Sequence, residues 1–152
     1  MTVKTSTGTL LAIVQGEPAS FDAAGYEALT FVDVGEVTDI PEYGPVFQVV
    51  THEPLATGIT QKHKGFVDYG SITYGLGQDT EDAGQKILLD SALIENVNEA
   101  YSICITMSDG TKDYFTGKIF SYTTNPGSAN SIIGSSAQFE INTPIVRVLP
   151  TP

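Results

Sequence analysis

Few side chains in this chain could do covalent or metal chemistry, and their spacing matches no catalytic pattern. The two histidines, His52 and His63, have no second histidine or cysteine at the spacing of zinc ligands. The single cysteine, Cys104, has no basic neighbour in sequence that would lower the pKa of its thiol. No Gly-x-Ser-x-Gly sequence, typical of a serine nucleophile, occurs. We therefore expect no catalytic residues, no metal, no cofactor and no enzymatic activity.

A glycine pair stands where a dinucleotide-binding loop would begin. Gly75-Leu76-Gly77 lies between a predicted strand and a predicted helix, but Thr80 occupies the position of the third glycine. The acidic residues Asp79, Glu81 and Asp82 would repel a pyrophosphate at the start of this helix. The pattern favours an ordinary turn from a strand into a helix.

The same segment partly matches a calcium-binding loop. Asp79, Glu81, Gly84 and Asp90 occupy positions 1, 3, 6 and 12 of that template. Position 5 is Ala83, which offers no side-chain ligand, and position 12 prefers a bidentate glutamate. A capped helix explains these residues better than a calcium site does.

Length and composition indicate a single folded domain spanning residues 1–152. A chain of 152 residues in which 41% are hydrophobic can bury a sizeable core without disulfides or metals. The N-terminal residues lack the charged start and apolar stretch of a signal peptide, so synthesis and assembly in a cytoplasm are expected.

The charge is strongly acidic. The formal net charge is −11, and Lys4 is the only basic residue before Gln61. This excludes a basic nucleic-acid-binding stripe, because phosphate binding depends on lysine and arginine. The imbalance fits either plain solubility or a surface that avoids adhering to DNA.

The hydrophobic pattern is mostly that of strands. Six segments read as strands or pairs of strands: 9–14, 29–40, 66–76, 101–107, 113–123 and 131–148. Asp109-Gly110 predicts a tight hairpin between two of them, and Asn125-Pro126-Gly127 ends the second. One helix is expected from about Thr80 to Leu93, capped by Asp79.

The segment from Pro41 to Lys64 fits neither pattern. Its prolines and glycines surround one short apolar island, residues 46–50. Loops longer than about 12–15 residues are uncommon in compact domains and are usually functional. We expect a long inter-strand loop, about residues 41–64, that acts as a binding arm.

Two strands have a second face that is polar. In Tyr101–Met107 alternate apolar residues point to the core, and the remaining residues must face something else. The strand near the C-terminus has the same alternation. The residues of this polar face are Ser102, Cys104, Thr106, Gln138, Glu140 and Asn142.

A series of short segments, taken in order and spacing, carries a family resemblance. These segments are Gly35-Glu36-Val37-Thr38-Asp39-Ile40, Gly44-Pro45, Thr51, Lys64-Gly65-Phe66-Val67-Asp68-Tyr69-Gly70, Asp79 with Gly84-Gln85 and Leu88-Leu89, Ser108-Asp109-Gly110, Phe115-Thr116-Gly117-Lys118-Ile119, and Gln138-Phe139-Glu140-Ile141. Together they resemble the major tail tube proteins of long, non-contractile-tailed bacteriophages (siphophages). The departures are an extended first hairpin, residues 15–27, and an end that carries Pro150 and Pro152.

The resemblance implies a mainly β fold, an antiparallel β-sandwich with one flanking α-helix and a long inter-strand loop. It also implies hexameric rings of this chain that stack into the tube of a virion. The polar face that begins at Ser102 and ends at Asn142 would be the candidate lumen face, a wall along which genomic DNA slides without specific binding. No membrane would be involved. The other partners would be the tail tip, tape measure and terminator proteins. The loop residues expected at subunit contacts are Pro41, Tyr43, Val46, Phe47, Val49, Val50, His52, Lys62 and Lys64.

Three other functions stay open. A monomeric ligand-binding β-sandwich, for example a carbohydrate-binding module, would need an aromatic-lined site, but tryptophan is absent. A small enzyme lacks the residue patterns described above. Another tail or capsid accessory protein is the third alternative.

Overall fold

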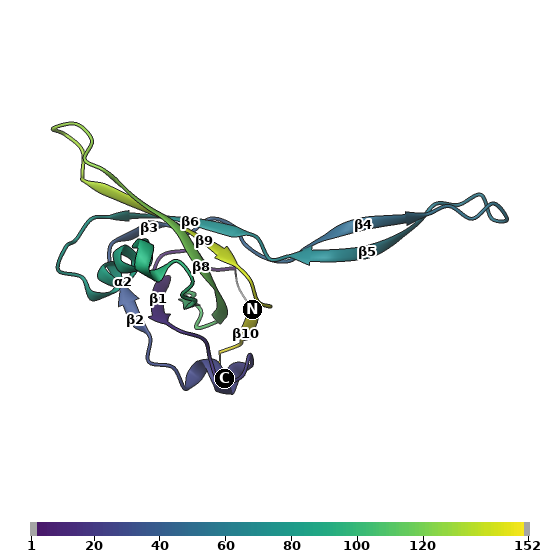
Figure 1. The fold of residues 1–152 in the computed structure, drawn as a ribbon, viewed down its shortest axis with the longest axis horizontal. Coiled ribbons are helices and arrows are strands. Elements are labelled where there is room, and N and C mark those ends of the chain that lie inside the picture. Colours follow the sequence, from purple (N-terminus) through teal and green to yellow (C-terminus); the bar gives the residue numbers. More distant parts are fainter. Residues whose placement is uncertain (1–2, 151–152) are drawn as a thin grey trace.

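The computed structural model describes residues 3–150 and shows a mainly β fold with antiparallel strand pairing (Figure 1). Among these residues, one sheet has the order β2-β1-β7-β8-β9-β6-β3, with β10 paired to β8, and a second sheet pairs β4 with β5. The strands are β1 Leu10–Gln15, β2 Val32–Val34, β3 Val37–Asp39, β4 Val46–His52, β5 Gln61–Asp68, β6 Ser71–Gly77, β7 Tyr101–Thr106, β8 Lys112–Asn125, β9 Gly134–Ile141 and β10 Val146–Val148. The predicted antiparallel β class is confirmed.

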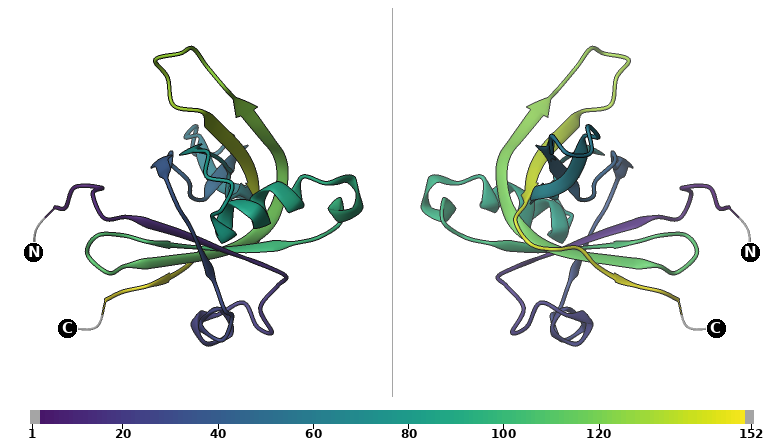
Figure 2. Two further views of the ribbon diagram at one scale, coloured as in Figure 1. Left: turned by 90° about the vertical axis from the view of Figure 1, so that its left-hand side faces the viewer. Right: turned by 90° about the vertical axis from the view of Figure 1, so that its right-hand side faces the viewer.

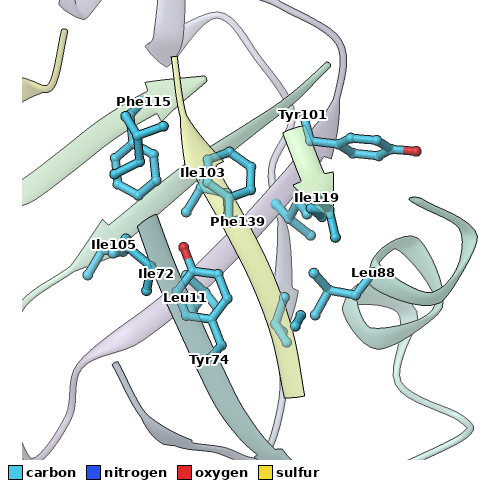
Figure 3. Packing of buried hydrophobic residues seen from close by; sticks show 14 of the residues in the cluster. Leu11, Ile72, Tyr74, Leu88, Tyr101, Ile103, Ile105, Phe115, Ile119 and Phe139 are labelled. Carbon is cyan, nitrogen blue, oxygen red and sulfur yellow. The ribbon is translucent and has the colours of Figure 1, made fainter. Parts of the chain in front are cut away.

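The long sheet folds over itself and encloses one hydrophobic core. β8 carries a bulge between Ile119 and Ser121, and Figure 2 shows it curving from one layer into the upright β8–β9 hairpin. Leu11 and Ile103 enter the core from β1 and β7, and Ile72 and Phe139 enter it from β6 and β9 (Figure 3). The two halves of the sheet therefore face each other as the layers of a sandwich.

Helix α2, Ala83–Ser91, covers one end of this core. It is shorter than predicted and begins later, because Asp82 rather than Asp79 accepts the capping hydrogen bond from the backbone N–H of Gln85 (3.0 Å). Leu88 points from α2 into the core (Figure 3). The Gln85 amide donates to the carbonyls of Gly35 (3.0 Å) and Gly77 (2.9 Å), which attaches the helix to two strand ends. A short 3₁₀ helix, η1, follows at Ile94–Asn96.

The segment 15–27 does not form the extended hairpin expected from its sequence. It contains a short helix, α1 (Ala23–Glu27), capped by the side chain of Asp22. Tyr26 of this helix is buried and stacks on Tyr114, with ring centroids 5.3 Å apart. A second, smaller core therefore lies on the opposite face of β1, β7 and β8.

Two other predicted strands are interrupted. The run 29–40 divides into β2 and β3, because Glu36 adopts a positive φ of 61° between them. The run 66–76 divides at Gly70, which has a φ of 94° and donates its N–H to the carboxylate of Asp68 (2.8 Å). The last predicted segment, 131–148, forms the two strands β9 and β10.

Pro152 lies outside the described residues. No helix within residues 3–150 is long and apolar enough to cross a membrane.

Candidate assembly interface

The most exposed part of the molecule is a two-stranded arm formed by β4 and β5 (Figure 1). β3 pairs with β6, and β4 pairs with β5, so the arm continues the edge of the main sheet outward. The predicted loop 41–64 is therefore wrong in its secondary structure, because most of it forms a β-hairpin. The apolar island 46–50 forms the first five of the seven residues of β4.

The arm forms a hairpin because β-branched and aromatic residues dominate its strands, as in Val46, Phe47, Val49 and Val50. Its pairing shifts register between Phe47 and Val49, where β5 supplies an extra residue. An isolated two-stranded hairpin is only marginally stable in water. A strand pair with this composition therefore needs a partner surface to stabilise it.

The cross-strand register gives the arm two different faces. Val49 lies opposite Lys64, and Thr51 lies opposite Lys62, so one face combines apolar and basic side chains. The Lys64 ammonium sits 4.7 Å from the centre of the Phe47 ring on this face. We call this the lysine face.

The other face carries both histidines of the chain. Val50 lies opposite His63, and His52 lies opposite Gln61. We call it the histidine face. Its Val50 is 51% exposed, and Val49 on the lysine face is 67% exposed, so both faces present apolar side chains to solvent.

Tyr43 anchors the arm where the arm leaves the body. Its ring packs on Phe115, with centroids 5.6 Å apart, and its hydroxyl donates to the Asp113 carboxylate (2.5 Å). Burial and the neighbouring Asp113 raise the pKa of Tyr43 well above its ordinary value. The backbone N–H of Gly44 donates to the Tyr69 carbonyl (3.3 Å) across the root.

The residues expected at subunit contacts all lie in the arm or its root. Pro41 and Tyr43 are half-buried at the root, whereas the seven others are exposed on the two strands: Val46, Phe47, Val49, Val50, His52, Lys62 and Lys64. Their role in contacts between subunits stays a prediction.

The expected lumen face divides into two parts. Ser102 and Cys104 are buried beneath the α1 segment, so the structure does not give these two residues a solvent-facing role. The Ser102 hydroxyl donates to the Gly16 carbonyl (2.8 Å) and also pairs with the Thr116 hydroxyl (3.0 Å). Thr106, at the end of β7, is half-buried.

The β9 part of that face is open to solvent. Gln138 and Glu140 are half-buried, Asn142 is exposed, and the Gln138 amide donates to the Glu140 carboxylate (2.8 Å). The strands on either side add small or polar residues in register with these two. Thr73 and Ser121 lie opposite Gln138, and Ser71 and Lys118 lie opposite Glu140. These residues form a polar face over β6, β9 and β8, interrupted by the exposed Phe120 between Lys118 and Ser121 on β8.

The chemistry-bearing residues do not come together. Within residues 3–150 no group of His, Cys, Asp and Glu side chains is arranged to hold a metal ion. Burial raises the pKa of the Cys104 thiol, which opposes its reaction as a thiolate. A hollow of about 320 Å³ beside the arm root is lined partly by Val37, Ile40 and Met107 and contains no catalytic constellation.

Sequence reasoning missed two other exposed apolar groups. One lies at and after the end of α2 and comprises Leu89, Leu93, Ile94 and Val97. The other comprises Ile132 and Ile133, which precede β9 at the far end of the β8–β9 hairpin. The adjacent pair Ile132-Ile133, close to the Asn125-Pro126-Gly127 turn, was the available signal for the second group.

Known structures share this fold over nearly the whole chain. A chain of the six-fold symmetrised baseplate of the anti-feeding prophage has a TM-score of 0.70 at 10% identity, covering 98% of this chain and 97% of that one. A chain of the sheath-tube complex of the extracellular contractile injection system PVC has a TM-score of 0.59 at 12% identity, with 92% and 88% covered. A type six secretion system protein has a TM-score of 0.53 at 13% identity, with 88% and 80% covered.

No known family and no curated protein matches the sequence itself. The non-contractile class suggested by the sequence resemblance stays a prediction, because the solved structures above come from an anti-feeding prophage, a contractile injection system and a type six secretion system. At this level of identity the similarity concerns the fold, and the chain has the fold of components of phage-tail-like injection systems.

Proposed function

We propose that this chain is a structural protein of a virion tail that polymerises as stacked, hexameric rings into a tube. The observation that carries the proposal is the arm, an ordered hairpin with apolar side chains exposed on both faces. Exposed strands with apolar side chains are an aggregation hazard unless a partner covers them. A neighbouring copy of the same chain is the partner that the fold supports.

Charge supports a contact between two different surfaces of neighbouring copies. Lys62 and Lys64, two of the seven basic residues in a chain of net charge −11, lie together on the lysine face. The rest of the chain is strongly acidic. Attraction between an arm and the body of the next copy would favour a head-to-tail contact, which closes into rings or extends as a filament.

The polar face over β6, β9 and β8 suits the lumen of such a tube. It bears small hydroxyls, an amide and a carboxylate, and Lys118 is its basic side chain opposite Glu140. A conduit of this kind would conduct genomic DNA during ejection without holding it, since affinity for DNA rises with each phosphate contact. This lumen assignment rests on Gln138, Glu140 and Asn142 and no longer includes Ser102 or Cys104.

A non-contractile tail is the class we propose, on the sequence segments that resemble siphophage tail tubes. The second candidate is the tube of a contractile injection system, which the sheath-tube complex among the similar structures favours. Isolation of native particles distinguishes them, because a contractile system has a second protein layer around the tube.

Negative-stain microscopy of the purified chain at high concentration tests the proposal directly. We expect rings and tubes. A stable 16 kDa monomer with no tubes, even when tail-tip proteins are present to initiate assembly, would contradict it.

Two single substitutions identify the docking face. Val49→Asp places a charge on the lysine face, and Val50→Asp places one on the histidine face. Thr57→Asp, near the arm tip, is the matched control, since it adds the same charge outside both strands. Loss of tubes with only one of the two valine variants would show which face is buried between subunits.

A further inference from the structure

A buried carboxylate connects the root of the arm to the C-terminal strand. Asp113 on β8 has no exposed surface, yet it is charged and hydrogen-bonded on both oxygens. Arg147 of β10 donates from Nε to Oδ1 (2.8 Å) and from Nη2 to Oδ2 (3.0 Å). The Tyr43 hydroxyl donates to the same Oδ2 (2.5 Å).

The cost of burying the Asp113 carboxylate makes the positions of its two partners specific. A buried charge is costly unless it is paired and fully hydrogen-bonded. Asp113 meets that condition only when Tyr43 and Arg147 hold their observed positions. The carboxylate therefore favours one placement of two segments that are 104 residues apart in sequence, as their numbers show.

The placement of Tyr43 sets the direction of the arm. Within residues 3–150, β4 and β5 pair only with each other, so the body holds the arm through its root alone. The seven residues of β4 span roughly 23 Å at about 3.3 Å per residue. A rotation of about 20° at the root would move the arm tip by about 8 Å, estimated from that same strand rise. Docking on a neighbour tolerates less than such a shift.

We propose that Asp113 is a positioning residue for the arm. It holds the Tyr43 hydroxyl so that the arm leaves the body in the direction needed to meet the next copy, and Arg147 ties this direction to β10. The inference rests on the proposed function in one respect, namely that the arm must reach another subunit. Its structural part, a fixed arm direction in the single chain, is independent of assembly.

The decisive variant is Tyr43→Phe. It removes only the hydroxyl and leaves the paired Asp113 and Arg147 in place, so the body should stay folded. The matched control is Tyr74→Phe, which removes a buried tyrosine hydroxyl that has no hydrogen-bond partner among residues 3–150. Asp113→Asn and Arg147→Lys are supporting variants, each checked for folding by circular dichroism.

The readout is the distance between two spin labels, one at the arm tip and one on the body. Leu55→Cys and Glu81→Cys provide the labelling sites in a Cys104→Ala background, because both positions are exposed. Measurements at low concentration keep the chain monomeric. We expect a narrow distance distribution for the parent protein and for Tyr74→Phe, and a distribution at least twice as broad for Tyr43→Phe, together with loss of tubes.

A Tyr43→Phe distribution as narrow as that of the parent would overturn the proposal, and so would a broad distribution in the parent itself. If the distances behave as expected but the parent protein forms no tubes, the proposed function fails and the positioning role of Asp113 stands.

Discussion

Alternate residues of β9 are buried in the body, whereas every residue of β4 in the arm is exposed. β4 contains more residues that favour β structure than β9 does, so strand propensity does not explain why β9 is the buried one. The difference lies in what covers each strand. The body supplies its own second layer, with Phe139 and Ile72 facing β1 and β7 across the core. The arm has strands but no second layer, which indicates that its cover comes from another molecule.

The first prediction tests this difference between body and arm by deleting the arm. We expect that replacing residues 47–67 by Asn-Gly, which favours a tight hairpin turn between Val46 and Asp68, leaves the body folded. Stability should change by no more than about 1 kcal/mol, because the deleted strands pack on no core residue. Tube formation should be lost completely. Thermal unfolding and negative-stain microscopy of the same sample check both halves of this expectation.

An unfolded or molten deletion variant would mean that the arm belongs to the core of its own subunit. Tubes of normal length would mean that the arm is dispensable for assembly.

The second prediction concerns packing in the body. A Cβ added at Gly117 on β8 would lie 1.9 Å from the Glu140 carbonyl oxygen on β9. Gly117→Ala should therefore cost about 3 kcal/mol or more, since backbone atoms must move apart. This corresponds to a fall in Tm of roughly 6–12 °C for a domain of this size. Differential scanning calorimetry measures it.

The arm offers the comparison variant, Gly65→Ala. There an added Cβ would lie 3.0 Å from a methyl group of Val50, whose side chain is exposed and can rotate away. It would also lie 3.2 Å from the Gln48 carbonyl oxygen, and a shift of a few tenths of an ångström between the two exposed strands would relieve that contact. A loss below about 1 kcal/mol is expected. Equal losses at Gly117 and Gly65 would show that arm and body are packed alike.

Much of the body could be predicted from local patterns. The alternation in Tyr101–Met107 and the Asp109-Gly110 turn gave β7 and its hairpin with β8, since both signals depend on neighbouring residues. The helix was predicted, but its cap was placed three residues too early. Asp79 and Asp82 are equally good caps, and only the packing of Gln85 between Gly35 and Gly77 favours the later start.

Contacts between segments far apart in the chain could not be predicted from local sequence patterns. Ser102 and Cys104 were predicted to be solvent-facing because they are the polar side of an alternating strand. Cys104 is buried because Tyr26, 78 residues earlier by their numbers, packs in the same cluster from α1. Ser102 is buried where its hydroxyl contacts the Gly16 carbonyl and the Thr116 hydroxyl. The sequence pattern set the segment 41–64 apart from the predicted strands. Pro45 and the glycines in 41–58 led to the prediction of a loop where the structure has a hairpin. The Tyr43–Asp113–Arg147 cluster had no signal in the sequence pattern.

The third prediction tests the polar face over β6, β9 and β8. Glu140→Lys should still fold and assemble, because Glu140 is only half-buried, and repulsion from Lys118 on the neighbouring strand should cost no more than about 1 kcal/mol. It should slow DNA ejection, since each ring would present additional cations to the phosphates, and high salt should relieve the defect. Ejection kinetics at two salt concentrations provide the measurement. Glu95→Lys on η1 adds the same charge change at an exposed site away from this face and should have no effect.

The smallest expected effect on stability concerns a tyrosine hydroxyl in the body, compared with one at the arm root. Tyr43 at the arm root has a charged partner, whereas the Tyr74 hydroxyl in the body core has no partner among residues 3–150. Burial raises the pKa of Tyr74 far above its ordinary value, so this hydroxyl stays neutral and contributes no ion pair. A buried hydroxyl without a hydrogen bond costs about 1–3 kcal/mol of desolvation, which the folded state no longer bears once the group is removed. Tyr74→Phe should therefore leave stability unchanged or raise it by about 1 kcal/mol in urea titration. A loss of more than about 1 kcal/mol would mean that the hydroxyl is hydrogen-bonded after all, for example to an ordered water molecule within the core.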